Sequence, residues 1–242
     1  MKTPSTPDPV LRVYGRRKGK PLKPQRQGLL DALLPTLTLP PPRTGAPLDP
    51  FAQFEPRPRQ VWLEVGFGGG EHLAAQAAAN PDIGLIGCDV FLNGVASLVR
   101  HVAARQLANV RIWPDDARAL LPHLPEASLA RLFVLFPDPW PKARHAKRRV
   151  IGPDTVDGLA RVLADGSQLR VASDHPIYVA WALAHLTAHP AFAWQVSGPD
   201  SWRARPADQV ETRYEAKARA QGRTPVFMTF LRRPRTPTST HP

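Results

Sequence analysis

The fold is decided by the stretch VWLEVGFGGGE, residues 61–71, in which a short apolar run leads into a glycine-rich turn. The run 61–65 predicts a buried strand, and the alanine-rich residues 71–79 predict a helix that ends at Asn80-Pro81. Glycines between a strand and a helix permit a tight turn and let a ligand approach the backbone at the helix N-terminus. The junction therefore predicts the first unit of an α/β fold with a ligand site at the turn.

Strand and helix signals continue to alternate after this junction. Further strands are expected at 83–88, 110–113, 129–136, 167–172, 192–196 and 226–231, with helices at 92–107, 153–163, 175–189 and 209–221. Such alternation predicts a doubly wound α/β fold with a mostly parallel sheet.

The glycine turn differs from a dinucleotide-binding turn. Gly66 and Gly68 are present, but the place of the third glycine in G-x-G-x-x-G is taken by Glu71. A carboxylate at a helix N-terminus would repel a pyrophosphate, which weakens the NAD interpretation. A ligand without phosphate, such as S-adenosylmethionine, suits the turn better.

Acidic residues follow the next three expected strands. Asp89 comes directly after residues 83–88, Asp116 follows 110–113, and Asp138 follows 129–136. In an open parallel sheet these positions converge on one crevice, where Asp89 can accept both hydroxyls of a ribose and Asp116 an adenine amino group. One strand-end aspartate is often only a helix cap, whereas a series after a glycine turn favours a nucleoside site.

A basic segment adjoins the last of these acids, in the stretch FPDPWPKARHAKRR at 136–149. Three prolines stiffen the backbone around Asp138 and Trp140. The following cations are expected to contact phosphates of a nucleic acid, although a solvated charged face would have the same composition. They are Arg144, Lys147, Arg148 and Arg149.

The net charge of +12 is concentrated at the two ends of the chain. Residues 1–60 carry 11 Lys and Arg against 4 Asp and Glu, residues 201–242 carry 9 against 3, and residues 61–200 carry 12 against 13. This distribution indicates a polyanionic partner that is held at the periphery of a nearly neutral domain.

Proline sets the expected domain boundaries. Residues 1–60 hold 13 of the 29 prolines, so 1–55 are predicted to be an extended, disordered basic arm without packed helix. Its cluster at 16–20 either contacts RNA phosphates or keeps the arm soluble. Residues 56–233 form the expected domain, and 234–242 a disordered tail.

The remaining features predict a soluble cytoplasmic protein without a metal centre. The N-terminus has no apolar signal segment, no window is apolar enough to span a membrane, and Cys88 is the single cysteine. His185 and His189 are four residues apart but belong to no H-E-x-x-H pattern, so no metal is expected.

Four motifs, in order, make the chain resemble the bacterial tRNA (guanine-N7-)-methyltransferase family. The family's PDPWPKxRHxKRR element stands at 137–149, its EIGxGxGE-type turn at 64–71, its strand-end Ser-Asp at 173–174 and its T-x-Y-E-x-K element at 212–217. The resemblance covers about residues 60–232 and leaves out the first 55. One departure is Asp89, where the family more often has Glu.

The resemblance implies a Rossmann-like class I methyltransferase that uses S-adenosylmethionine and forms m7G at position 46 in the tRNA variable loop. It assigns Glu64 to the amino-acid portion of the cofactor, Asp89 to the ribose and Asp116 to the adenine. Gly66, Gly68 and Asp138 would also bind the cofactor, and Asp138 is the candidate catalytic residue. The substrate-binding positions would be Lys142, Asp174, Thr212, Arg213, Tyr214 and Glu215.

Alternatives remain at each level. Asp174 can cap the helix that follows, and Glu215 can pair with Arg219 one turn away. The whole chain can instead be a class I methyltransferase with another substrate, or an RNA-binding protein that kept the fold without activity. Whether it is a monomer or a homodimer stays open.

Overall fold

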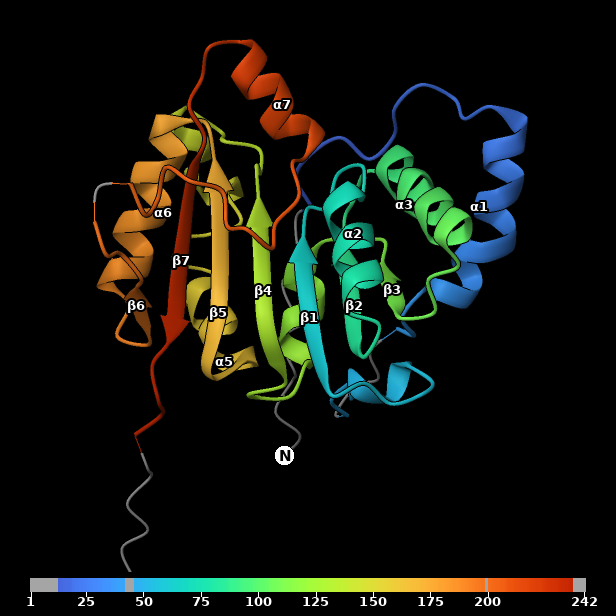
Figure 1. Cartoon of the computed structure of the whole chain (residues 1–242), viewed down its shortest axis with the longest axis horizontal. Coiled ribbons are helices and arrows are strands. Elements are labelled where there is room, and N and C mark those ends of the chain that lie inside the picture. Colours follow the sequence, from blue (N-terminus) through green and yellow to red (C-terminus); the bar gives the residue numbers. More distant parts are fainter. Residues whose placement is uncertain (1–12, 42–45, 199, 237–242) are drawn as a thin grey trace, which may run out of the picture.

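A seven-stranded sheet in the order β3-β2-β1-β4-β5-β7-β6 organises the protein (Figure 1). The structure is a computed structural model that describes residues 13–41, 46–198 and 200–236. The first five strands are parallel, and β7 runs antiparallel between β5 and β6. The strands are β1 (Gln60–Val65), β2 (Ile83–Cys88), β3 (Val110–Trp113), β4 (Leu129–Leu135), β5 (Leu163–Ser173), β6 (Phe192–Trp194) and β7 (Val226–Arg232). The predicted doubly wound, mostly parallel fold is confirmed.

Helices cover both faces of the sheet. The α-helices are α1 (Pro24–Leu37), α2 (Glu71–Ala79), α3 (Leu92–Arg105), α4 (Ala117–Leu120), α5 (Val156–Val162), α6 (Pro176–Ala188) and α7 (Arg213–Ala220). Short 3-10 turns are η1 (Phe51–Gln53), η2 (Leu121–His123) and η3 (Ala143–Arg148). Helices α1 and α4 and the 3-10 turns were not predicted from the sequence, and β5 begins earlier than expected.

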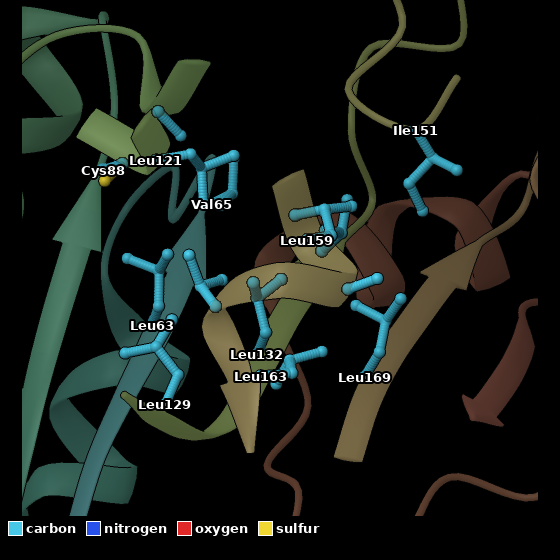
Figure 2. Close-up of a cluster of buried hydrophobic side chains, with 14 of the residues drawn as sticks. Leu63, Val65, Cys88, Leu121, Leu129, Leu132, Ile151, Leu159, Leu163 and Leu169 are labelled. Atoms are coloured by element: carbon cyan, nitrogen blue, oxygen red, sulfur yellow. The ribbon is translucent and has the colours of Figure 1, made fainter. Parts of the chain in front are cut away.

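The two hydrophobic cores follow from the alternation of side chains along the strands. Leu63 and Val65 of β1 point to the face covered by α5 and α6, where they belong to the same buried cluster as Leu132 of β4 and Leu169 of β5 (Figure 2). Trp62 points to the opposite face and joins the core with α2 and α3. Because both faces of the sheet are covered, β2 is apolar and buried at every residue, as in other parallel sheets covered on both sides.

The prediction of an extended arm over 1–55 is wrong for residues 24–37, which form α1 and pack against α3. Leucines at 29, 30, 33, 34 and 37 recur at helical spacing, and Leu30 and Leu37 are buried. Pro24 stands at the start of the helix, where its missing N–H costs nothing, and Pro35 lies in the last turn. The leucine pattern was therefore the better signal than the proline content.

The tail also differs from its prediction in the part that the structure describes. Arg235 donates to the carbonyls of Arg161 and Leu163 at 2.8 and 2.9 Å and forms ion pairs with Asp165 and Glu126. These contacts fix residues 234–236, whereas 237–242 lie outside the described residues. Among the described helices, none has the length and apolar character needed to cross a membrane.

Candidate active site

A cavity of about 320 Å³ opens at the carboxyl edge of the parallel strands. The loops after β1, β2, β3 and β4 all reach this edge, and α7 lies above it (Figure 1). The cavity is lined by both turn glycines, all three strand-end aspartates and one residue of α7. These are Gly66, Gly68, Asp89, Asp116, Asp138 and Tyr214. The residues that follow the strands thus line one crevice, as predicted.

Glycine is required at three positions of the turn after β1, and two of them line the crevice. Gly66 and Gly68 have φ of +75° and +57°, a region that side chains other than glycine rarely adopt. A Cβ at position 68 would also lie 2.5 Å from Tyr214 Cε2, so the turn fits closely beneath α7. At Gly66 nothing lies within 4 Å of the position of a Cβ, which leaves the backbone open to the crevice.

Asp89 is held rigidly at the end of β2. Its Oδ2 accepts a hydrogen bond from the Gly68 amide at 2.7 Å, and its Oδ1 accepts one from the Phe91 amide at 2.8 Å. Burial raises the pKa of Asp89 to about 6; the two amide hydrogen bonds oppose this rise, and the charges of Asp138 and Glu64 add to it. Each oxygen still has acceptor capacity for a ligand hydroxyl.

Asp116 is already engaged within the protein. It caps α4 by accepting from the Arg118 amide at 2.9 Å, and its carboxylate pairs with the Arg118 guanidinium at 2.6 Å. The residue lines the crevice, but its charge is matched by a neighbouring cation. Its predicted contact with adenine remains a prediction.

Asp138 occupies a strained, proline-flanked loop after β4. The neighbouring Phe136 and Trp140 have φ of +50° and +42°, values that are unusual for residues other than glycine. The carboxylate is exposed, and the described residues provide no hydrogen-bond or ion-pair partner for it. It is therefore available to a ligand in the crevice.

The four cations after Asp138 lie in different environments. Arg144 and Lys147 are exposed, whereas Arg148 lines the crevice with its guanidinium 4.8 Å from the centre of the Trp140 ring. Arg149 is buried and donates to the carbonyls of Pro139 and Trp140 at 3.0 and 2.9 Å. This burial argues against the predicted phosphate contact of Arg149, because its guanidinium holds the Asp138 loop instead.

Glu64 lies beneath the crevice instead of lining it. Its Oε2 is 2.8 Å from Nδ1 of His72, and both side chains are buried. The side-chain nitrogen of Gln76 lies 3.3 Å from the other ring nitrogen of His72, Nε2, and can donate a hydrogen bond to it. The carboxylate thus belongs to a buried network between β1 and α2, and its predicted contact with the cofactor remains untested.

The predicted substrate-binding residues divide into exposed and internally bonded groups. Lys142 and Arg213 are exposed, and Tyr214 is exposed at the edge of the crevice. The Thr212 hydroxyl caps α7 by accepting from the Glu215 amide at 3.1 Å. This hydrogen bond gives the Thr212 side chain a structural role.

The acids of this group are engaged in ion pairs. Glu215 is completely buried and lies 3.1 Å from Arg219, the pairing that its spacing of four residues allows. Asp174 pairs with Arg223 and does not cap α6, whose N-cap residue is His175 and which has no side-chain cap. Their predicted contacts with guanine remain predictions.

Sequence reasoning missed one wall of the crevice. Tyr14, Gly15 and Arg16, which were assigned to a disordered arm, line the cavity. No local pattern marks them as site residues, because their position depends on contacts with segments about 75 to 100 residues away. In the part of the chain that the structure describes, no group of three or more His, Cys, Asp or Glu side chains is arranged to hold a metal.

The strand order and the crevice at its carboxyl edge define a class I S-adenosylmethionine-dependent methyltransferase fold. The 16S rRNA methyltransferase KamB shares it with a TM-score of 0.54 and 19% identity, over 76% of this chain and 93% of that one. The 16S rRNA (adenine(1408)-N(1))-methyltransferase from Catenulisporales acidiphilia, solved with S-adenosylmethionine, has a TM-score of 0.51 and 20% identity, over 79% of this chain and 95% of that one.

Sequence comparison identifies the family. A family model described as "Putative methyltransferase" matches residues 58–228. The tRNA (guanine-N(7)-)-methyltransferase of Rhodospirillum rubrum is 58% identical over 96% of this chain and 92% of its own length. That of Paramagnetospirillum magneticum is 59% identical over 93% and 94%. The chain belongs to the tRNA (guanine-N(7)-)-methyltransferase family.

The extent of these matches corrects one expectation. A similarity that covers 96% of the chain must reach into the proline-rich first 55 residues, which were expected to lie outside the resemblance. This segment is therefore shared with relatives, in agreement with the helix and the crevice wall that it contributes.

Proposed function

We propose that the protein transfers the methyl group of S-adenosylmethionine to N7 of the guanosine at position 46 of tRNA, in the cytoplasm. The observation that carries this proposal is the single crevice that joins the glycine turn and Asp89 to Asp138 and α7. Membership of the family supports the choice of tRNA and of guanine N7.

The residues of the crevice fit S-adenosylmethionine. The open backbone at Gly66 leaves room beside β1, and Asp89 has one acceptor position free on each oxygen for the two ribose hydroxyls. Four aspartates (89, 115, 116 and 138) and three arginines (16, 118 and 148) line the crevice, and the carboxylates of Asp89 and Asp138 can attract the sulfonium cation of this ligand. When bound, this cofactor supplies an electrophilic methyl group.

The chemistry demands positioning more than proton transfer. Guanine N7 carries a lone pair and no proton, so no general base is needed to generate the nucleophile. The protein's contribution is to hold the base in line for attack and to exclude water, which is catalysis by orientation. An uncommitted carboxylate at the crevice mouth suits this task, because it accepts from the guanine N1–H and 2-amino groups at once. Asp138 has this character.

The tRNA body would be held outside the crevice. Lys142, Arg144 and Lys147 are exposed cations that follow Asp138 in the sequence. At the other side, Arg213 is exposed and adjoins Tyr214, which lines the crevice. Cations in such positions bind phosphates chiefly by charge, and an exposed aromatic ring can stack on a base.

The test supplies labelled S-adenosylmethionine and unmodified tRNA, then maps m7G by chemical cleavage of the product. We expect a single m7G in the variable loop. Methylation at another guanine would overturn position 46 alone, and the absence of m7G from every suitable tRNA would overturn the proposed activity.

Asp138→Asn should lower turnover by at least about 100-fold, because a misplaced base loses the orientation on which the rate depends. Its tRNA affinity should stay close to that of the wild type. Asp200→Asn is the matched control, since Asp200 is an exposed acid whose ion pair is with Arg203. Wild-type turnover in Asp138→Asn would remove Asp138 from the mechanism.

A further inference from the structure

Residues 13–20, which we call the strap, are fixed to the body of the protein. The Arg17 guanidinium donates to Asp115 Oδ1 at 2.7 Å, and the Arg17 carbonyl accepts from the Leu92 amide at 2.9 Å. Asn93 binds the strap through both side-chain atoms, accepting from the Gly19 amide at 2.7 Å and donating to the Lys20 carbonyl at 2.8 Å. The strap is therefore tied to both the start of α3 and the loop before α4.

These anchors lie beside the two acids after β2 and β3. Leu92 and Asn93 begin α3 just after Asp89, and Asp115 directly precedes Asp116. In Figure 1 the segment before α1 passes the start of α3 on its way to the carboxyl edge of β1. Gly19 permits this close path, since a Cβ there would lie 2.7 Å from Asn93 Oδ1.

Tyr14, near the start of the strap, reaches the opposite side of the crevice. The ring of Tyr14 lies 5.3 Å from the Arg118 guanidinium and 5.2 Å from that of Arg148. Arg118 belongs to α4, whereas Arg148 belongs to η3 and also faces the Trp140 ring at 4.8 Å. Tyr14 thus links the two sides of the crevice through cation–π contacts.

We infer that the strap is a wall of the cofactor site and that Tyr14 retains the bound nucleoside. This inference rests on the proposed function for the identity of the ligand. An aromatic ring in the wall supplies apolar area to a purine or ribose, and the Arg17–Asp115 pair holds the ring in place. The strap acts on cofactor affinity, separately from any attraction of its cations for tRNA.

The test measures binding of S-adenosylhomocysteine to the full-length protein by calorimetry. Tyr14→Ala should weaken it about fivefold, the loss of roughly 1 kcal/mol that a partly buried cation–π and packing contact provides. Arg17→Ala should weaken it as well, since the strap then lacks its ion pair with Asp115. Lys18→Ala is the matched control, because Lys18 is an exposed strap cation, and it should leave this affinity unchanged.

A charge exchange separates anchoring from net charge. Arg17→Asp alone should weaken S-adenosylhomocysteine binding, and Arg17→Asp combined with Asp115→Arg should restore it in part. Wild-type affinity in both Tyr14→Ala and Arg17→Ala would overturn the strap as a cofactor wall while leaving the methyltransferase activity standing. The inference is supported if the wild-type protein forms m7G and the two variants bind S-adenosylhomocysteine more weakly than it does. If the wild-type protein forms no m7G, the proposed function fails instead.

Discussion

The three strand-end aspartates form one series in the sequence, yet their environments differ. Asp89 is bonded to two backbone amides, Asp116 is paired with Arg118, and Asp138 is exposed without a partner in the described structure. These environments suit different tasks. A carboxylate fixed by amides orients a bound ribose, whereas an uncommitted one can adapt to an incoming base.

Asp89 makes cofactor binding dependent on pH. Ribose hydroxyls donate best to the ionised carboxylate, and the pKa of Asp89 is about 6. Binding therefore favours the deprotonated form, and affinity for S-adenosylhomocysteine should fall by up to about tenfold for each pH unit below the pKa. Calorimetry between pH 5 and 8 measures this dependence, with a plateau expected above pH 7.

Rising pH has the opposite effect on the stability of the fold, which Asp89 lowers. The raised pKa lets the folded protein hold a proton that the unfolded chain releases at its usual pKa of 3.8, so Asp89 lowers the free energy of unfolding as pH rises between these values. Asp89→Asn should bind the ligand more weakly at pH 7 and lose the dependence below 6. An unchanged pH profile in this variant would assign the titration to another group.

Among the elements, η3 and the residue after it place neighbouring cations in different environments, one buried and one exposed. Arg149 follows the turn and points inward, where it bonds to the Asp138 loop and lies 4.6 Å from the Trp181 ring of α6. Lys147, two residues earlier, is exposed. A run of like charges thus combines a structural residue with surface residues.

Arg149→Ala should lower the free energy of unfolding by about 2 kcal/mol, because two carbonyl groups of the loop lose their buried donor. It should also lower turnover, since the loop that carries Asp138 is released. Denaturant unfolding measures the first effect and the methylation assay the second. Lys147→Ala serves as the comparison and should change the unfolding free energy by less than about 0.5 kcal/mol. Equal stability of the two variants would contradict the structural role of Arg149.

Elements with strong local signals were predictable from the sequence. The strands β2 and β3 and helix α2 coincide with their predicted ranges, because apolar runs and alanine-rich stretches determine them locally. Helix α1 was hidden by prolines that it tolerates at its ends. The burial of the Arg149 side chain was not predictable. Neighbouring cations of a short turn look alike in the sequence, and tertiary contacts decide which of them is buried.

Over the whole molecule, the basic ends are less available than their net charge suggests. Arg17 pairs with Asp115, Arg57 with Asp49, Arg59 with Asp82, and Arg235 with Asp165 and Glu126. Ion pairs of this kind reduce the field that a polyanion meets. The exposed cations Arg144 and Lys147 lie beside the crevice instead, within the nearly neutral middle of the sequence.

The salt dependence of tRNA binding tests this distribution of charge. Each phosphate contact contributes a slope of about 0.7 to 0.9 to the decrease of log K with log salt. Arg144→Ala combined with Lys147→Ala should therefore weaken binding and reduce the slope by about 1.5. Arg57→Ala combined with Arg59→Ala removes the same charge at the amino end of β1, opposite the crevice, and should leave the slope nearly unchanged. Equal slopes in the two double variants would mean that tRNA binding responds to net charge alone and would contradict a phosphate contact beside the crevice.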